Sequence, residues 1–125
     1  ADLKQALEIS LKKYPRESGR FLHIAGAKIE FDSTKKAGER IVNVFVKNSD
    51  GNYVQVKDEQ TYSIVTNTFL AMGAEGFQMF EKSYAAGKVT DTGILQWQNF
   101  RDYLRELKKI PTETEGRIVD IAGQK

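Results

Sequence analysis

The stretch AKIEFDSTKKAGERIVNVFVK, residues 27–47, decides the fold class because it holds two strand patterns separated by a polar, glycine-containing loop. Along residues 27–31, apolar side chains alternate with Lys28 and Glu30, which is typical of a strand with one buried face. Residues 41–46 are almost continuously apolar, which predicts a strand buried on both faces. The centre of the chain therefore predicts part of a β-sheet.

Further segments extend this sheet. The sequence NSDGN at residues 48–52 predicts a hairpin turn, because Asp-Gly tolerates the positive φ angles that tight turns require. Residues 53–57 predict the returning strand, residues 62–65 another short strand, and residues 117–121 a last strand. Strands interleaved with helices at unequal spacing favour an α+β fold, a layered domain with a mixed β-sheet flanked by helices. We expect residues 1–125 to form this single domain.

Two amphipathic helices are predicted, one before the first strand segment and one before the last. Residues 2–14 place apolar side chains at the i, i+3, i+4 spacing of one helix face. The second helix follows Asp91 or Thr92, either of which can cap it. A proline ends each helix. The apolar face of the second helix includes Trp97 and Phe100, and we expect both to lie in the core.

The composition excludes several classes of site. The 125 residues include 19 Lys and Arg, 17 Asp and Glu, one His and no Cys. The chain can therefore build neither a Cys/His zinc site nor a thiolate nucleophile, and any metal would need carboxylate ligands. The net charge of +2 comes from interspersed signs, so nucleic acid is not an expected partner. No apolar run approaches the roughly 20 residues that span a bilayer.

Most candidate catalytic groups have a simpler structural explanation. His23 lies between Leu22 and Ile24, where a single histidine is more often structural or exposed than catalytic. Three carboxylate pairs lie in polar segments that look solvated: Asp2 and Glu8, Asp58 and Glu59, and Glu113 and Glu115. There is no GxSxG motif for a serine nucleophile. We therefore predict no catalytic residue.

The segment FLAMGAEGF at residues 69–77 is a candidate binding loop. It fits neither a helix nor a strand, because Gly73 and Gly76 interrupt both patterns, and we expect a loop with an aromatic residue at each end. Glycines let the backbone approach a ligand closely, while Phe69 offers a flat ring and Glu75 a hydrogen-bond acceptor. The alternative is a turn whose aromatic residues fill the core.

The order of motifs resembles the C-terminal domain of the 5′-nucleotidase family, which includes bacterial UDP-sugar hydrolases and animal ecto-5′-nucleotidases. The matching segments are LKQALE at 3–8, GRFLHIAG at 19–26, FD at 31–32, GERI at 38–41, Tyr62, NTFLAMGAEGF at 67–77 and EGRI at 115–118. Each motif is short, but they follow the family's order from one end of the chain to the other.

The resemblance implies a two-domain hydrolase that removes phosphate from nucleotides. In this family an N-terminal metallophosphatase domain holds two divalent metal ions, and the C-terminal domain binds the base and ribose. The chain then corresponds to the later part of the substrate-binding domain, with no cofactor of its own, and we expect it to be inactive without the metal domain. The resemblance also implies an extracellular, cell-surface or periplasmic location.

The resemblance assigns substrate-binding roles to three residues of the loop. Phe69 matches an aromatic that stacks on the nucleobase, and Gly73 lies in the same substrate-contacting loop. Glu75 stands where the family has an aspartate that accepts hydrogen bonds from the ribose hydroxyls. The sequence departs from the family pattern at Glu75, whose extra methylene displaces the carboxylate by about 1 Å, and at Ala74, which replaces a glycine.

Two functions are compatible with these residues. The first is nucleotide recognition, with a nucleotide or nucleoside and the metallophosphatase domain of the parent chain as partners. The alternative is a non-catalytic extracellular interaction or scaffold domain that kept the fold and lost the site, which the departures at Ala74 and Glu75 motivate. The sequence does not choose among 5′-mononucleotides, cyclic nucleotides and nucleotide sugars. Exposed sheet edges also predict self-association of the chain.

Overall fold

The computed structural model describes residues 1–123, which form two compact units. The sheet unit combines Ala1–Ile64 with the segment that begins at Gly116, and the helical unit consists of Val65–Glu115.

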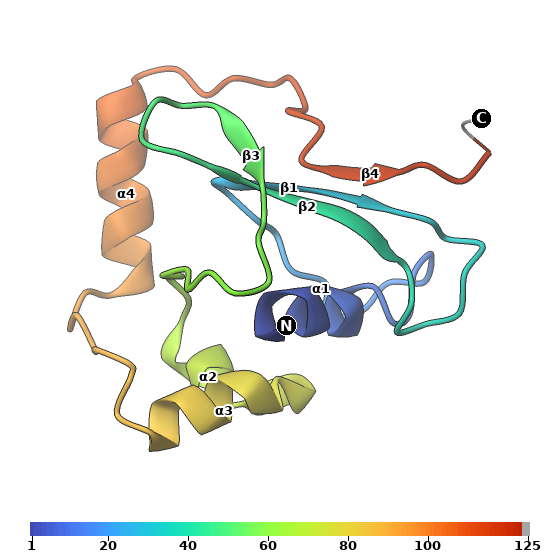
Figure 1. Ribbon diagram of the computed structural model, residues 1–125. Coiled ribbons are helices and arrows are strands. Elements are labelled where there is room, and N and C mark those ends of the chain that lie inside the picture. Colours follow the sequence, from blue (N-terminus) through green and yellow to red (C-terminus); the bar gives the residue numbers. More distant parts are fainter. Residues whose placement is uncertain (124–125) are drawn as a thin grey trace. The chain divides into compact units, whose positions relative to one another are not determined.

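The sheet unit contains a mixed β-sheet and one helix. Over the described residues, four strands are ordered β3-β2-β1-β4. Their bounds are β1 Ala27–Phe31, β2 Ile41–Lys47, β3 Tyr53–Gln55 and β4 Ile118–Asp120. β2 is antiparallel to both β1 and β3, whereas β4 is parallel to β1 (Figure 1). This arrangement confirms the predicted α+β fold with a mixed sheet.

Helix α1 (Asp2–Ser10) covers one face of the sheet and closes the core (Figure 1). The buried cluster consists of Leu7, Leu11, Ile29, Phe31, Ile41 and Val44. The ring of Tyr14 packs edge-on against Phe31 with 4.9 Å between the ring centroids. Burying one such aliphatic or aromatic side chain contributes about 1.5–3 kcal/mol, so this cluster supplies the main stabilisation of the unit.

A β-bulge in β2 corrects the prediction that residues 41–46 are buried on both faces. Glu30 pairs with Asn43, but the next residue of β1, Phe31, pairs with Ile41. The register therefore passes over Val42, which is 37% exposed. On the face away from the core, the Asn43 amide donates a hydrogen bond of 2.6 Å to the Glu30 carboxylate. One face of β2 thus packs on α1, while the other carries Asn43 and the half-buried Phe45.

The hairpin between β2 and β3 is confirmed, but the strand predicted at residues 62–65 is not. The Asn48 side-chain oxygen accepts hydrogen bonds from the backbone N–H groups of Asp50 and Asn52, and Gly51 has φ +84°. β3 ends at Gln55, two residues earlier than predicted. Residues 62–65 form no strand, because no neighbouring strand pairs with them.

A buried carboxylate joins α1 to the start of β2. The sequence predicts a solvated Glu8, but this residue is only 7% exposed. Its two carboxylate oxygens accept hydrogen bonds from the backbone N–H groups of Arg40, at 3.0 Å, and Ile41, at 2.6 Å. The Arg40 guanidinium in turn donates to the carbonyl oxygens of Leu11 and Tyr14, which follow the last turn of α1.

Helix α1 ends at Ser10, and tight turns replace the predicted continuation to Tyr14.

The helical unit begins with α2 (Thr68–Ala71), the 3-10 turn η1 (Ala74–Gly76) and α3 (Gln78–Ala85). The loop predicted at 69–77 is therefore largely helical. Helix α3 was not predicted, although Phe77, Phe80 and Tyr84 follow a helical spacing of three and four residues. α2 and α3 pack against each other (Figure 1). Ala71, Phe77 and Met79 are buried.

Helix α4 (Gln96–Leu107) confirms the second predicted helix but not its predicted core. Trp97 is 57% exposed and Phe100 63% exposed, so the expectation that both are buried is wrong for this structure. Asp91 and Thr92 do not cap the helix, because Leu95 is the N-cap and the Asp91 carboxylate accepts a hydrogen bond from the Gly93 N–H instead. Amphipathic spacing predicted where the helix lies, not what covers its apolar face.

Among residues 1–123, no helix is both long enough and apolar enough to cross a membrane.

Candidate functional site

The candidate site is the segment 67–77 of the helical unit, called the Phe69 loop below. Asn67 begins it as the N-cap of α2, with an extended backbone at φ −79° and ψ 160°. Its side-chain oxygen accepts a hydrogen bond of 2.9 Å from the Leu70 N–H, and its carbonyl accepts one from the Ala71 N–H. This cap places Phe69 in the first turn of the helix, where its side chain is 62% exposed.

The other end of the Phe69 loop is anchored in the core of the helical unit. Phe77 is fully buried, and its ring stacks on Phe80 with a centroid distance of 5.6 Å and an interplanar angle of 8°. The two aromatic residues of the loop therefore have different environments. The alternative that the loop aromatics fill the core holds for Phe77 but not for Phe69.

The backbone reverses direction in the middle of the Phe69 loop. Gly73 has φ +86°, and a Cβ placed there would lie 2.5 Å from the Cβ of Glu81 on α3. Glu75 adopts the left-handed region at φ 59° and ψ 15°, which is uncommon for a residue other than glycine, asparagine or aspartate. The Glu75 side chain is exposed, and Gly76 follows with φ +92°.

Replacing Gly73 by alanine is expected to destabilise the helical unit by about 2 kcal/mol, because both backbone strain and the contact with Glu81 oppose a Cβ. The matched control is Gly76→Ala, which has a similar φ but open space around the added Cβ, and which is expected to cost about 1 kcal/mol. Urea unfolding monitored by circular dichroism measures both values. Equal losses for the two variants would show that the close approach to α3 has no energetic effect.

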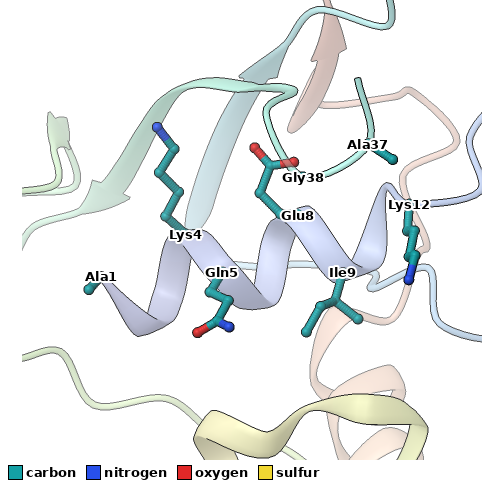
Figure 2. A pocket seen from close by; sticks show the side chains of 8 residues that line it. All are labelled: Ala1, Lys4, Gln5, Glu8, Ile9, Lys12, Ala37 and Gly38. Carbon is teal, nitrogen blue, oxygen red and sulfur yellow. The ribbon is translucent and has the colours of Figure 1, made fainter. Parts of the chain in front are cut away.

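A hollow lies beside α1 in the sheet unit. It is lined by residues of α1 and by Ala37 and Gly38, and Figure 2 shows Glu8 pointing from the helix toward the loop at Gly38. Both oxygens of Glu8 already accept backbone hydrogen bonds. The Lys4 and Lys12 side chains are exposed. This hollow therefore offers solvated ammonium groups and no poised acid or base.

Two further carboxylates lie where β1 and β4 end. The Thr34 hydroxyl, at 2.5 Å, and the Thr34 N–H hold the pKa of Asp32 below its ordinary value. The pKa of Asp120 is lowered by the side chain of Ser33 and then by the backbone N–H groups of Ala122 and Ser33. Both groups therefore stay ionised at neutral pH and serve as turn acceptors, not as proton donors.

The described residues do not fit a metal centre. Within residues 1–123, no three His, Cys, Asp or Glu side chains gather closely enough to hold a metal ion. His23 is exposed, and its ring meets Phe21 edge-on with 5.6 Å between the ring centroids.

Of the sequence-predicted site residues, Phe69, Gly73 and Glu75 all lie in the Phe69 loop, within one compact unit. Sequence analysis gave no role to Asn67, although Asn before Thr-Phe-Leu-Ala is a typical N-cap signal.

Residues 1–82 match the family model described as 5′-nucleotidase, C-terminal domain. The chain belongs to this family. Among curated relatives of this 5′-nucleotidase C-terminal domain, the trifunctional nucleotide phosphoesterase YfkN of Bacillus subtilis is 29% identical over 120 residues, covering 95% of the chain. A snake venom 5′-nucleotidase from Macrovipera lebetinus is 30% identical over 124 residues, covering 97% of the chain.

A solved structure confirms the fold of the 5′-nucleotidase C-terminal domain. The 5′-nucleotidase precursor from Thermus thermophilus superposes with a TM-score of 0.83 and 36% identity over 95% of the chain. The chain spans only 8% of the Bacillus relative, 30% of the venom relative and 23% of the Thermus structure. These relatives are therefore much longer proteins, of which the chain matches one part.

Proposed function

We propose that this chain is the base- and ribose-recognition part of a 5′-nucleotidase-type phosphoester hydrolase that acts in nucleotide catabolism. The observation that carries the proposal is the exposed ring of Phe69 on a loop that is capped at one end and buried at the other. A ring held in this way offers a flat apolar face without a large ordering cost on binding.

The chemistry of the Phe69 loop suits a nucleoside. Stacking of a phenyl ring on a nucleobase contributes about 1–3 kcal/mol and depends little on which base is bound. A carboxylate on an exposed residue such as Glu75 can accept hydrogen bonds from two vicinal hydroxyls, and Gly73 has no side chain where a Cβ would meet Glu81. The names of the relatives, a nucleotide phosphoesterase and 5′-nucleotidases, support a nucleotide as the ligand.

In this proposal the phosphoester chemistry lies outside the described residues. A metallophosphatase domain of the parent chain would hold two divalent metal ions, which would supply an activated water and charge stabilisation for the phosphoryl group. The residues of this chain bind and orient the nucleoside, so the chain alone is expected to be inactive. The venom relative supports placement of the parent protein outside the cytoplasm.

A second candidate function rests on the departures at Ala74 and Glu75. Glutamate in place of the family's aspartate adds a methylene before the carboxylate, and Ala74 replaces a glycine, which fits a non-catalytic extracellular interaction or scaffold domain that kept the fold and lost the site. Sequencing the coding region upstream distinguishes the hydrolase from the scaffold domain. Asp, His and Asn metal motifs there favour the hydrolase, and their absence favours the scaffold.

Titration of the ¹⁵N-labelled chain with adenosine tests the proposal. We expect chemical-shift changes concentrated in residues 67–77, because the ring current of a stacked base acts over a few ångströms. AMP should perturb the same residues, whereas ribose 5-phosphate, which lacks the base, should leave the Phe69 amide unchanged. Shifts confined to the sheet unit, or equal responses to ribose 5-phosphate and AMP, would contradict base recognition by this loop.

A further inference from the structure

We propose that Asn67 is a positioning residue that holds the ring of Phe69 in its ligand-ready orientation, an inference that rests on the proposed function. Asn67 acts through the backbone of α2 and not through contact with the ligand. The assignment follows from its place in the fold, two residues before Phe69 and at the junction between an extended segment and a helix.

The hydrogen bonds around Asn67 define how it acts. Its side chain accepts from the Leu70 N–H at 2.9 Å, and its carbonyl accepts from the Ala71 N–H at 3.0 Å. Phe69 lies between Asn67 and these two anchored amides. Asn67 therefore fixes the backbone on both sides of the residue that carries the exposed ring.

The length of α2 makes this cap important. α2 is a four-residue helix, a single turn, and such a turn is unfavourable by itself because several dihedral angles are fixed for very few hydrogen bonds. At its other end Ala71 is buried, so the turn is held in place from that side. Phe69 itself is exposed and receives little orientation from packing. The Asn67 cap is then the contact that keeps the first turn helical.

The experiment combines substitutions at Asn67 with Phe69→Ala. Adenosine affinity is measured by NMR titration, and the exchange rate of the Leu70 amide reports the cap directly. We expect Asn67→Ala to weaken adenosine binding about fivefold and to speed Leu70 exchange, since loss of an N-cap has an effect of this size. Asn67→Asp keeps the acceptor and should bind within about twofold of the unsubstituted chain. In the Phe69→Ala background, Asn67→Ala should cause no further loss.

Asn48→Ala is the matched control, because Asn48 also caps a turn by accepting backbone N–H groups but lies in the sheet unit. It should leave adenosine affinity unchanged. Retained affinity in Asn67→Ala despite faster Leu70 exchange overturns the inference alone. A loss that persists in the Phe69→Ala background also overturns it, because Asn67 would then act independently of the ring. An unchanged affinity in Phe69→Ala itself overturns the proposed function as well.

Discussion

Replacing Glu8 by alanine is expected to lower the free energy of unfolding of the sheet unit by about 2–4 kcal/mol. The carboxylate is buried and accepts hydrogen bonds from the N–H groups of both Arg40 and Ile41. Removing it leaves two donors without an acceptor at the edge of the core, and each unsatisfied buried donor costs about 1–3 kcal/mol. Urea unfolding followed by far-ultraviolet circular dichroism measures the loss.

Two variants separate this effect from a general effect of lost charge. Glu8→Gln keeps one acceptor oxygen, so we expect it to destabilise the unit by less than Glu8→Ala. Glu59→Ala removes an exposed carboxylate from the same unit and should change stability by no more than about 0.5 kcal/mol. Equal stabilities for Glu8→Ala and Glu59→Ala would show that the buried hydrogen bonds at β2 contribute nothing.

The role of Glu8 also shows where reasoning from sequence stops. Local patterns identified β1, β2, β4 and the hairpin, because strand alternation and Asp-Gly turns depend on neighbours in the chain. The acceptor role of Glu8 depends on Arg40 and Ile41, which lie 32 and 33 residues away. A glutamate on a helix face looks solvated until the segment that covers it is known.

The same limit explains the errors in the second half of the chain. The spacing of Trp97 and Phe100 predicts a helix face, but burial of that face requires a partner, and within α4 no side chain is buried. The segment at 62–65 has the composition of a strand but no neighbour to pair with. Periodicity therefore predicted the position of α4 but not whether its apolar face is covered.

For the candidate site, the sequence proposes the residues but not their geometry. The resemblance singled out Phe69, Gly73 and Glu75, and the structure places all three in one loop with Phe69 exposed. The left-handed backbone of Glu75 could not be predicted, because glutamate rarely adopts it without constraint from its surroundings. The Gly73 contact with Glu81 depends on α3, which sequence analysis missed.

Replacing Phe69 by alanine is expected to weaken adenosine binding by about 5- to 150-fold, which corresponds to the 1–3 kcal/mol that one stacked base contributes. The ring is 62% exposed in the free chain, so its removal leaves no cavity and should change stability little. Isothermal titration calorimetry or NMR titration measures the affinity. Phe69→Trp retains an aromatic face and should keep most of the affinity, whereas Phe69→Leu keeps apolar bulk without a π-system and should lose it.

Phe100→Ala provides the matched control for this substitution. Phe100 lies in the same helical unit and is 63% exposed, almost the same as Phe69, but it belongs to α4 and not to the Phe69 loop. If stacking on the loop drives recognition, Phe100→Ala should bind adenosine as the unsubstituted chain does. Equal losses for the two variants would mean that exposed aromatic surface binds the base without regard to position. Selective loss in Phe69→Ala would instead locate the base at the exposed ring that the Asn67 cap holds in place.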